Sequence, residues 1–191
     1  MEIRRQIRES IELKNKVLED RSFIENLENG VHLMVDTYRA GGKVLFCGNG
    51  GSAADAQHLA AELSGRFYLD RPPLNAEALH VNSSFVTATA NDLSFDKIFE
   101  RMLRALGKKG DVLVAFSTSG NSPNILLALQ AANSMGVKTI GFTGAGGGNM
   151  GKYCDILFKV PSEDTARIQE LHMLLGHILC EHVESILFSA K

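Results

Sequence analysis

A unit made of a short apolar strand, a loop rich in glycine and serine, and a helix occurs twice in this sequence, at residues 43–63 and 111–135. The centre of each strand is apolar on both faces, which is typical of strands that a parallel sheet buries between helices. The loops are Gly48 to Ser52 and Ser117 to Ser122. Loops between a parallel strand and the next helix gather at one edge of the sheet, where ligands bind. The repeated unit therefore predicts a ligand site built from both loops.

Strands and helices alternate along the chain, which predicts an α/β fold of three layers, with a parallel sheet between two layers of helices. About five strands are expected, at residues 43–47, 76–81, 111–116, 137–142 and 156–160. Helices are expected at residues 52–63, 84–90, 97–106, 123–135 and 163–187, the last of them long.

The N-terminal part of the chain reads as two further helices within residues 1–39, with a break at Asp20 to Ser22. A capping-box-like pair, Ser52 and Asp55, is expected to start the helix after the first loop. Because no linker or low-complexity stretch divides the chain, we expect one domain, 1–191, on which residues 1–40 pack as a helical extension.

The composition restricts the partners of this chain. Its 191 residues are 45% hydrophobic, and the net charge of -2 favours neither nucleic acid nor an anionic membrane surface. The three cysteines form no paired motif, which favours a reducing compartment. No apolar run approaches the ~18 residues of a membrane helix, and the N-terminus does not read as a signal peptide. We expect a cytoplasmic protein with no nucleic-acid and no membrane partner.

The second loop has the composition of a phosphate site. Ser117, Thr118, Ser119 and Ser122 supply four hydroxyl groups directly before a helix, and the loop holds no lysine or arginine. The first N–H groups of a helix are unpaired and its dipole favours an anion, so this loop suits a phosphorylated metabolite that must leave again. Either loop alone could be an ordinary turn, but two such loops after two strands favour a bound ligand.

Nucleotide-binding motifs match less well. Gly48, Gly50 and Ala53 fit a dinucleotide fingerprint, but no acidic residue ends the strand at 76–81 to bind a ribose. The pair Gly42-Lys43 is followed by valine rather than by the Ser or Thr of a Walker A loop. We therefore expect no nucleotide cofactor.

Polar residues on two helices are candidates for chemistry. His58 and Glu62 share one helix face and could bind metal or transfer protons, although such a pair is more often a surface salt bridge. Gln169 and His177 lie two turns apart on the closing helix and could both reach one site if that helix packs across it. His177 could equally be a histidine of the core. His172 points elsewhere and is expected to be structural or exposed.

The segment C-G-N-G-G-S-A-A-D-A-Q-H-L-A-A-E-L-S-G-R-F, from Cys47 to Phe67, resembles the first signature of bacterial phosphoheptose isomerases, which are sugar isomerase (SIS) domain enzymes. The rest of that pattern is matched by Asn91-Asp92, S-T-S-G-N-S at 117–122, T-A-R-I-Q-E-L-H at 165–172, and His177. The likeness spans nearly the whole chain, and the full set of motifs is specific to this branch.

The resemblance implies a three-layer SIS fold and an aldose–ketose isomerase. The implied reaction converts D-sedoheptulose 7-phosphate to D-glycero-D-manno-heptose 7-phosphate through an enediol, which is the first step of nucleotide-activated heptose biosynthesis for lipopolysaccharide and other surface polysaccharides. It also implies a homotetramer with sites between subunits and one zinc ion per subunit.

Roles for single residues are implied by position in the matched motifs. Glu62 and His177 would be the catalytic acid/base pair. The zinc ligands would be His58, Glu62, Gln169 and His177. The phosphate would be held by Ser117, Thr118, Ser119 and Ser122. The sugar would be lined by Asn49, Gly50, Gly51, Asn91 and Asp92, with Ser52 and Gln169 also at the substrate.

Two other functions compete with the isomerase. A close SIS paralogue is a non-catalytic tetrameric adaptor that binds the replication initiator DnaA and keeps both loops, but it lacks the helix carboxylate and the late histidine. Glu62 and His177 are both present here, which favours the enzyme. A regulatory SIS domain that senses sugar phosphates usually accompanies a second domain, for which this chain has no room.

Overall fold

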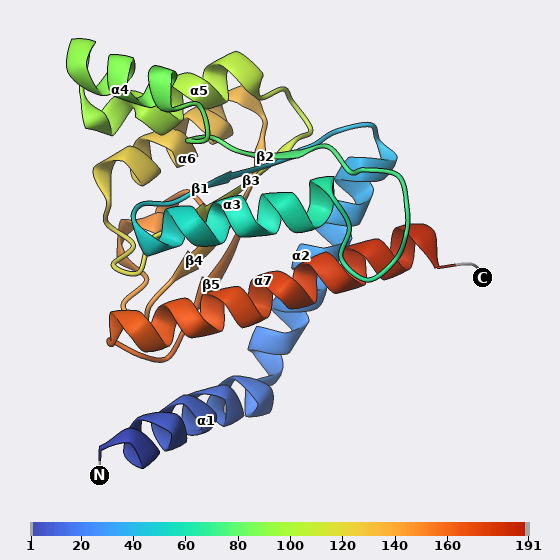
Figure 1. Cartoon of the computed structure of the whole chain (residues 1–191), viewed down its shortest axis with the longest axis vertical. Coiled ribbons are helices and arrows are strands. Elements are labelled where there is room, and N and C mark those ends of the chain that lie inside the picture. Colours follow the sequence, from blue (N-terminus) through green and yellow to red (C-terminus); the bar gives the residue numbers. More distant parts are fainter. Residues whose placement is uncertain (1, 190–191) are drawn as a thin grey trace.

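The computed structural model describes residues 2–189, which form three layers around one sheet (Figure 1). All pairings in the sheet are parallel, and the strand order is β2-β1-β3-β4-β5. The strands are β1 Val44–Cys47, β2 Ala76–Ala78, β3 Val112–Phe116, β4 Lys138–Thr143 and β5 Ile156–Lys159. The helices are α1 Ile3–Glu19, α2 Arg21–Arg39, α3 Gly51–Ser64, α4 Ser83–Asp92, α5 Ile98–Leu106, α6 Pro123–Met135 and α7 Thr165–Phe188, with short 3-10 turns at Phe95–Lys97 and Gly148–Lys152. The predicted three-layer α/β/α fold with a five-stranded parallel sheet is confirmed.

Side chains of the central strands alternate between two cores, because successive residues of a strand point to opposite faces. Val44 and Phe46 of β1 belong to the core under α2, α3 and α7, whereas Leu45 and Cys47 belong to the core under α5 and α6. Residues of α4 pack at the margin of this second core. The helices α3 and α7 are thus on one side of the sheet, and α4, α5 and α6 are on the other.

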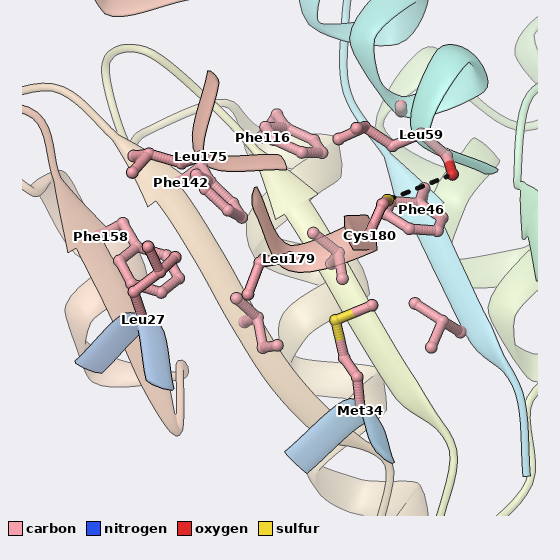
Figure 2. Packing of buried hydrophobic residues seen from close by; sticks show 14 of the residues in the cluster. Leu27, Met34, Phe46, Leu59, Phe116, Phe142, Phe158, Leu175, Leu179 and Cys180 are labelled. Carbon is pink, nitrogen blue, oxygen red and sulfur yellow. Dashed lines mark hydrogen bonds between the residues drawn. The ribbon is translucent and has the colours of Figure 1, made fainter. Parts of the chain in front are cut away.

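The first core is rich in aromatic rings. Phe116, Phe142 and Phe158 lie side by side on β3, β4 and β5, and Figure 2 shows Leu175 and Leu179 of α7 covering them. Burying apolar side chains of this size contributes ~1.5–3 kcal/mol each. Helix α7 is therefore held across the carboxyl half of the sheet by its apolar face.

The expected break between the first two helices is confirmed. The carboxylate of Asp20 caps α2 by accepting a hydrogen bond from the N–H of Phe23 at 3.1 Å. Helix α1 buries only Leu13 and Val17 and contacts α2 and α7 through few residues. Most of its surface is left free for other contacts.

Two details of the expectation are wrong. Helix α3 begins at Gly51, with Gly50 as its N-cap at φ +56°, so Ser52 does not cap the helix. Glycine takes this backbone conformation without strain, and the helix starts one residue early as a result. Strand β2 ends at Ala78 rather than at residue 81, because the chain turns away after the N–H of Leu79 bonds to the carbonyl of Phe46.

Helix α7 corrects a further expectation. By length and composition it is apolar enough to cross a membrane, with a mean hydropathy of 1.2 over 18 residues. The core helix of a globular fold meets the same criterion, and Leu171, Leu175, Leu179 and Val183 of α7 are buried against the sheet and its neighbouring helices. Its hydropathy is accounted for by this packing.

Candidate active site

The two glycine- and serine-rich loops lie side by side, because β1 and β3 are neighbours in the sheet. Asn49 and Asn124 join them through a pair of amide hydrogen bonds, at 2.9 Å and 2.8 Å. Asn124 is buried in the first turn of α6. The structure therefore ties the first loop to the helix that follows the second.

The hydroxyl groups of the second loop converge. Ser117 Oγ lies 3.0 Å from Ser122 Oγ and 3.4 Å from Ser119 Oγ, and Ser119 Oγ accepts a hydrogen bond from the N–H of Asn121. Ser117 is buried, with 5% of its surface exposed. These hydroxyl groups thus gather before the N-terminus of α6, the end of a helix that favours an anion.

A pocket of about 250 Å³ opens beside this loop. Thr118 and Ser119 line it together with segments that the sequence analysis did not single out. These are Gly144 to Gly146 after β4, and Ser162, Glu163, Thr165 and Ile168 around the start of α7. The sequence does hold a signal for the part of the pocket after β4. A run of glycines at 146–148 follows a buried strand, as the first loop does.

His58, Glu62 and His177 meet on the surface between α3 and α7. His58 Nε2 lies 3.0 Å from Glu62 Oε1 and 3.0 Å from His177 Nε2. The ring of Phe67 packs on His177, with 5.7 Å between ring centroids. His177 is half-buried rather than part of the core, so the core interpretation of this histidine is wrong. The pair on α3 is present as predicted, but a residue 115 positions later in the sequence completes the group.

A close approach of α3 and α7 makes this group possible. A Cβ atom at Gly176 would lie 2.4 Å from Cδ1 of Leu59. Gly176 and Leu59 directly neighbour His177 and His58 in the sequence. Only glycine at position 176 lets the two helices come this near, a feature that the sequence analysis did not detect.

The group meets the geometric requirements of a metal site. Its three ligand atoms all lie within 4.8 Å of one another. Nitrogen and oxygen ligands of a tetrahedral zinc ion, at ~2.0–2.1 Å from the metal, lie about 3.3 Å apart. The observed separations of 3.0 Å are close to that value, so one carboxylate and two imidazoles can share one ion.

Gln169 lies on α7 about two turns before His177, nearer the two glycine- and serine-rich loops. Its Nε2 is 3.5 Å from Ser52 Oγ, and its side chain packs against Gly51, where a Cβ would be 2.7 Å away. Ser52 is buried, with 4% of its surface exposed. Gln169 therefore connects the start of α3 to α7. We call the second loop, Ser117 to Ser122, the hydroxyl loop below.

Asn91 and Asp92 are not brought together with the other candidates. They end α4, on the opposite side of the sheet from α3 and α7, and the Asn91 amide donates to the Asp92 carboxylate at 2.8 Å. Asp92 lines a groove of about 530 Å³ with residues of the α4–α5 connection. Within the described part of one chain, these two residues belong to a separate surface.

Two further titratable groups are perturbed near the site. Burial raises the pKa of Asp55 to about 6, against the opposing effect of His58, and its Oδ2 is buried without a hydrogen-bond partner among the described residues. Burial lowers the pKa of His172 to about 4, although its bond to the carbonyl of Thr143 acts in the opposite direction. His172 is fully buried against Phe116 and Phe142, which confirms a structural place for it.

Comparison with known proteins identifies the family. The SIS domain family profile matches residues 7–144. A phosphoheptose isomerase of Clostridium acetobutylicum is 52% identical over 189 residues, which cover 99% of this chain and 96% of that protein. The chain belongs to the phosphoheptose isomerase family. Other members of the family include one from Mycobacterium tuberculosis, 49% identical over 96% of this chain and 93% of its own.

Solved phosphoheptose isomerases have the same fold. The structure from Neisseria gonorrhoeae superposes with a TM-score of 0.90 at 42% identity, and that from Francisella tularensis with 0.92 at 36% identity. Each comparison covers 96% of this chain and 97% of the other. The chain is therefore an isomerase of this family, and the comparisons give no support to the DnaA-binding adaptor.

Proposed function

We propose that this enzyme converts D-sedoheptulose 7-phosphate to D-glycero-D-manno-heptose 7-phosphate, the first step toward nucleotide-activated heptoses for lipopolysaccharide and other surface polysaccharides. The observation that carries the proposal is the meeting of Glu62, His58 and His177 between α3 and α7. The family to which the chain belongs supports the same reaction.

The phosphate is held by Ser117, Thr118, Ser119 and Ser122. Ser117 Oγ already lies within 3.4 Å of both Ser119 Oγ and Ser122 Oγ, and these hydroxyls precede the N-terminus of α6, whose dipole favours an anion. Because the loop carries no cation, binding relies on hydrogen bonds and stays reversible. This suits a substrate and a product that share the same phosphate.

The sugar chain extends from the phosphate across the start of α3. Gln169 and Ser52 face each other there, beside Gly50 and Gly51. Asn49 lies in the same loop, where its amide is paired with that of Asn124 in the first turn of α6. Backbone without side chains at the two glycines lets a polyol approach closely.

Glu62 and His177 are the acid/base pair. One takes a proton from C1 while a proton is delivered to the carbonyl oxygen at C2, which produces the enediol. A proton is then returned to C2 as the O1 hydroxyl loses its own, and the carbonyl has moved to C1 with no net oxidation. Positioned proton transfer of this kind contributes typically ~10²–10⁴-fold to a rate.

Zinc fits the same residues. His58, Glu62 and His177 would hold one ion per subunit, with Gln169 as the fourth ligand, and a bound zinc would polarise the carbonyl and stabilise the enediolate. A carboxylate and an imidazole bound to a metal are poorer bases, so Glu62 and His177 take up protons when they are not acting as ligands.

The working enzyme is a cytoplasmic homotetramer with sites between subunits. Asn91 and Asp92 line the sugar in this proposal, yet they lie across the sheet from α3 and α7. Exposed Leu93 and Phe95 flank them, as expected of a surface that meets another subunit. A second copy can therefore supply the two residues that one chain does not bring to its own site.

The proposal is tested by incubating the pure protein with sedoheptulose 7-phosphate and following the heptose 7-phosphate formed, with and without added zinc. We expect turnover by the wild type and a loss of at least ~100-fold in Glu62→Gln and His177→Ala. Zinc should also raise the melting temperature of the wild type but not of His58→Ala, because only the folded site binds the ion.

Lys138→Met is a control, since Lys138 lies at the amino end of β4, at the edge of the sheet opposite the site, and forms an exposed ion pair with Asp155. It should keep wild-type turnover. A wild type that makes no heptose 7-phosphate under either condition would exclude the proposed reaction, and full activity in both site variants would exclude the assigned pair.

A further inference from the structure

A buried ion pair outside the proposed site joins the end of α3 to α7. Arg71 Nε lies 2.9 Å from Glu184 Oε2, and both side chains are only 2% exposed. Arg71 follows α3 in a loop, and Glu184 lies in the last two turns of α7. Neither residue belongs to a motif that the sequence analysis identified.

Arg71 completes the C-terminal end of α3. Its guanidinium donates to the carbonyl of Glu62 at 2.9 Å and to that of Leu63 at 2.7 Å, and it also reaches the carbonyls of Gly65 and Pro72. The last carbonyls of a helix lack partners within the helix, and α3 has no basic residue in its own last turn. Arg71 thus supplies both the donors and the positive charge that this end of the helix requires.

Glu184 orders the loop that carries Phe67. Its two oxygens accept hydrogen bonds from the N–H groups of Phe67, Tyr68 and Leu69 at 2.7–3.0 Å. Burial acts to raise the pKa of Glu184, but these three N–H groups and Arg71 outweigh it and hold that pKa below its ordinary value. The carboxylate of Glu184 therefore fixes three consecutive backbone N–H groups.

Both contacts lead directly to the proposed acid/base pair. Arg71 holds the backbone of Glu62 itself. Glu184 holds the backbone of Phe67, whose ring packs on His177, and Glu184 lies seven residues after His177, on the same face of α7.

Stability alone does not account for this pair. Buried ion pairs lose much of their attraction to desolvation, and apolar residues of similar volume are often equally stable. What an apolar replacement could not do is bind four carbonyls and three N–H groups in fixed directions.

We infer that Arg71 and Glu184 are positioning residues that hold Glu62 and His177 in the geometry for proton transfer. The inference rests on the proposed function, since it assigns these residues a part in that reaction. Arg71 acts through the last turn of α3, and Glu184 acts through Phe67.

The test compares Arg71→Met, Arg71→Lys and Lys43→Met. Lys43→Met is a matched control, because half-buried Lys43 also forms an ion pair, 2.7 Å from the buried Asp111, whose carboxylate accepts two backbone N–H groups. That pair lies at the amino ends of β1 and β3, at the edge of the sheet opposite the site. Each variant is assayed below its own melting temperature.

We expect Arg71→Met to lower kcat on the order of 10- to 100-fold while KM changes less than about two-fold, since a small displacement of the pair slows chemistry more than binding. Arg71→Lys should recover part of kcat, because it restores the charge but not the fork of donors. Lys43→Met should lose stability and keep the wild-type kcat. If Arg71→Met does not fold, the intermediate kcat of Arg71→Lys carries the test.

A wild-type kcat in folded Arg71→Met or Arg71→Lys, or an equal loss in Lys43→Met, would overturn the inference. Amide hydrogen exchange provides a readout that needs no substrate: residues 62–69 should exchange faster in the Arg71 variants but not in Lys43→Met, and unchanged exchange would also overturn it. An inactive wild type would instead contradict the proposed reaction, and the exchange measurement would still decide on Arg71 and Glu184.

Discussion

The histidines of α3 and α7 differ in exposure and in their hydrogen-bond partners, and these differences determine their roles. His58 and His177 are both accessible and face each other at 3.0 Å. His172, on the same helix as His177, is fully buried and has one carbonyl partner, Thr143, while its Nδ1 has none among the described residues. Two histidines five positions apart on α7 are thus a candidate ligand and a packing residue.

The buried His172 predicts a pH dependence of stability. Its pKa in the folded protein is about 4, below the ordinary value of 6.5, so the unfolded chain takes up the proton first. The stabilisation is therefore complete above pH 6.5 and is lost as the pH falls toward 4, by about 3 kcal/mol. Urea denaturation across this range should show the loss in the wild type and a smaller loss in His172→Asn. Equal slopes in both proteins would contradict this.

At the scale of elements, α3 and α7 form the framework of the proposed site. Helix α3 starts from the first loop at Gly51 and carries His58 and Glu62. Helix α7 lines the pocket beside Ser119 at its start, contacts Ser52 through Gln169, and presents His177 two turns later. The distance between these two helices controls whether the three ligand atoms meet.

Replacing Gly176 with alanine should separate the helices. Alanine normally stabilises a helix interior relative to glycine by ~1 kcal/mol, but here its Cβ would lie 2.4 Å from the buried Leu59. We expect Gly176→Ala to be destabilised by about 1–3 kcal/mol and to bind zinc more weakly, as measured by denaturation and metal titration. Gly151→Ala, where the nearest atom is 3.6 Å away, should show neither effect. A more stable Gly176→Ala with unchanged zinc binding would contradict this account.

At the scale of the whole molecule, one chain leaves apolar surface uncovered. Ile3, Ile7 and Ile11 recur every four residues along α1 and are each more than half exposed. A stripe of this kind on a helix that makes few contacts within its own chain marks an interaction surface. In the proposed tetramer, this stripe packs against another subunit.

Placing a charge in that stripe should weaken assembly. Ile7→Lys is expected to lower the mass measured by light scattering from that of a tetramer, because burying an unpaired ammonium group is costly. The helix content by circular dichroism should stay the same, since Ile7 is 58% exposed within the chain. Glu19→Lys, at the exposed end of α1, should remain tetrameric. A tetrameric Ile7→Lys would show that α1 does not form the interface.

Much of the secondary structure follows from local signals in the sequence. Glycines around the β1 segment, Pro123 at the start of α6 and the Asp20 break each act within a few residues, so these elements were predicted close to their observed bounds. The start of α3 was misplaced because Gly50 takes a conformation that a capping-box pattern does not reveal. The end of β2 depended on its pairing with β1, a contact outside the segment itself.

The sequence by itself determined the α/β class and the hydroxyl loop, because strand burial and turn chemistry are local properties. Only the tertiary structure decided that His177 joins His58 and Glu62, that Arg71 and Glu184 anchor the end of α3, and that Asn91 and Asp92 lie across the sheet. The physical reason is that each of these depends on packing between segments distant in the chain. The spacing of His58 and Glu62 shows only that they share one face of α3. Which residue lies opposite that face depends on the packing of α7, which glycine at position 176 allows to come close.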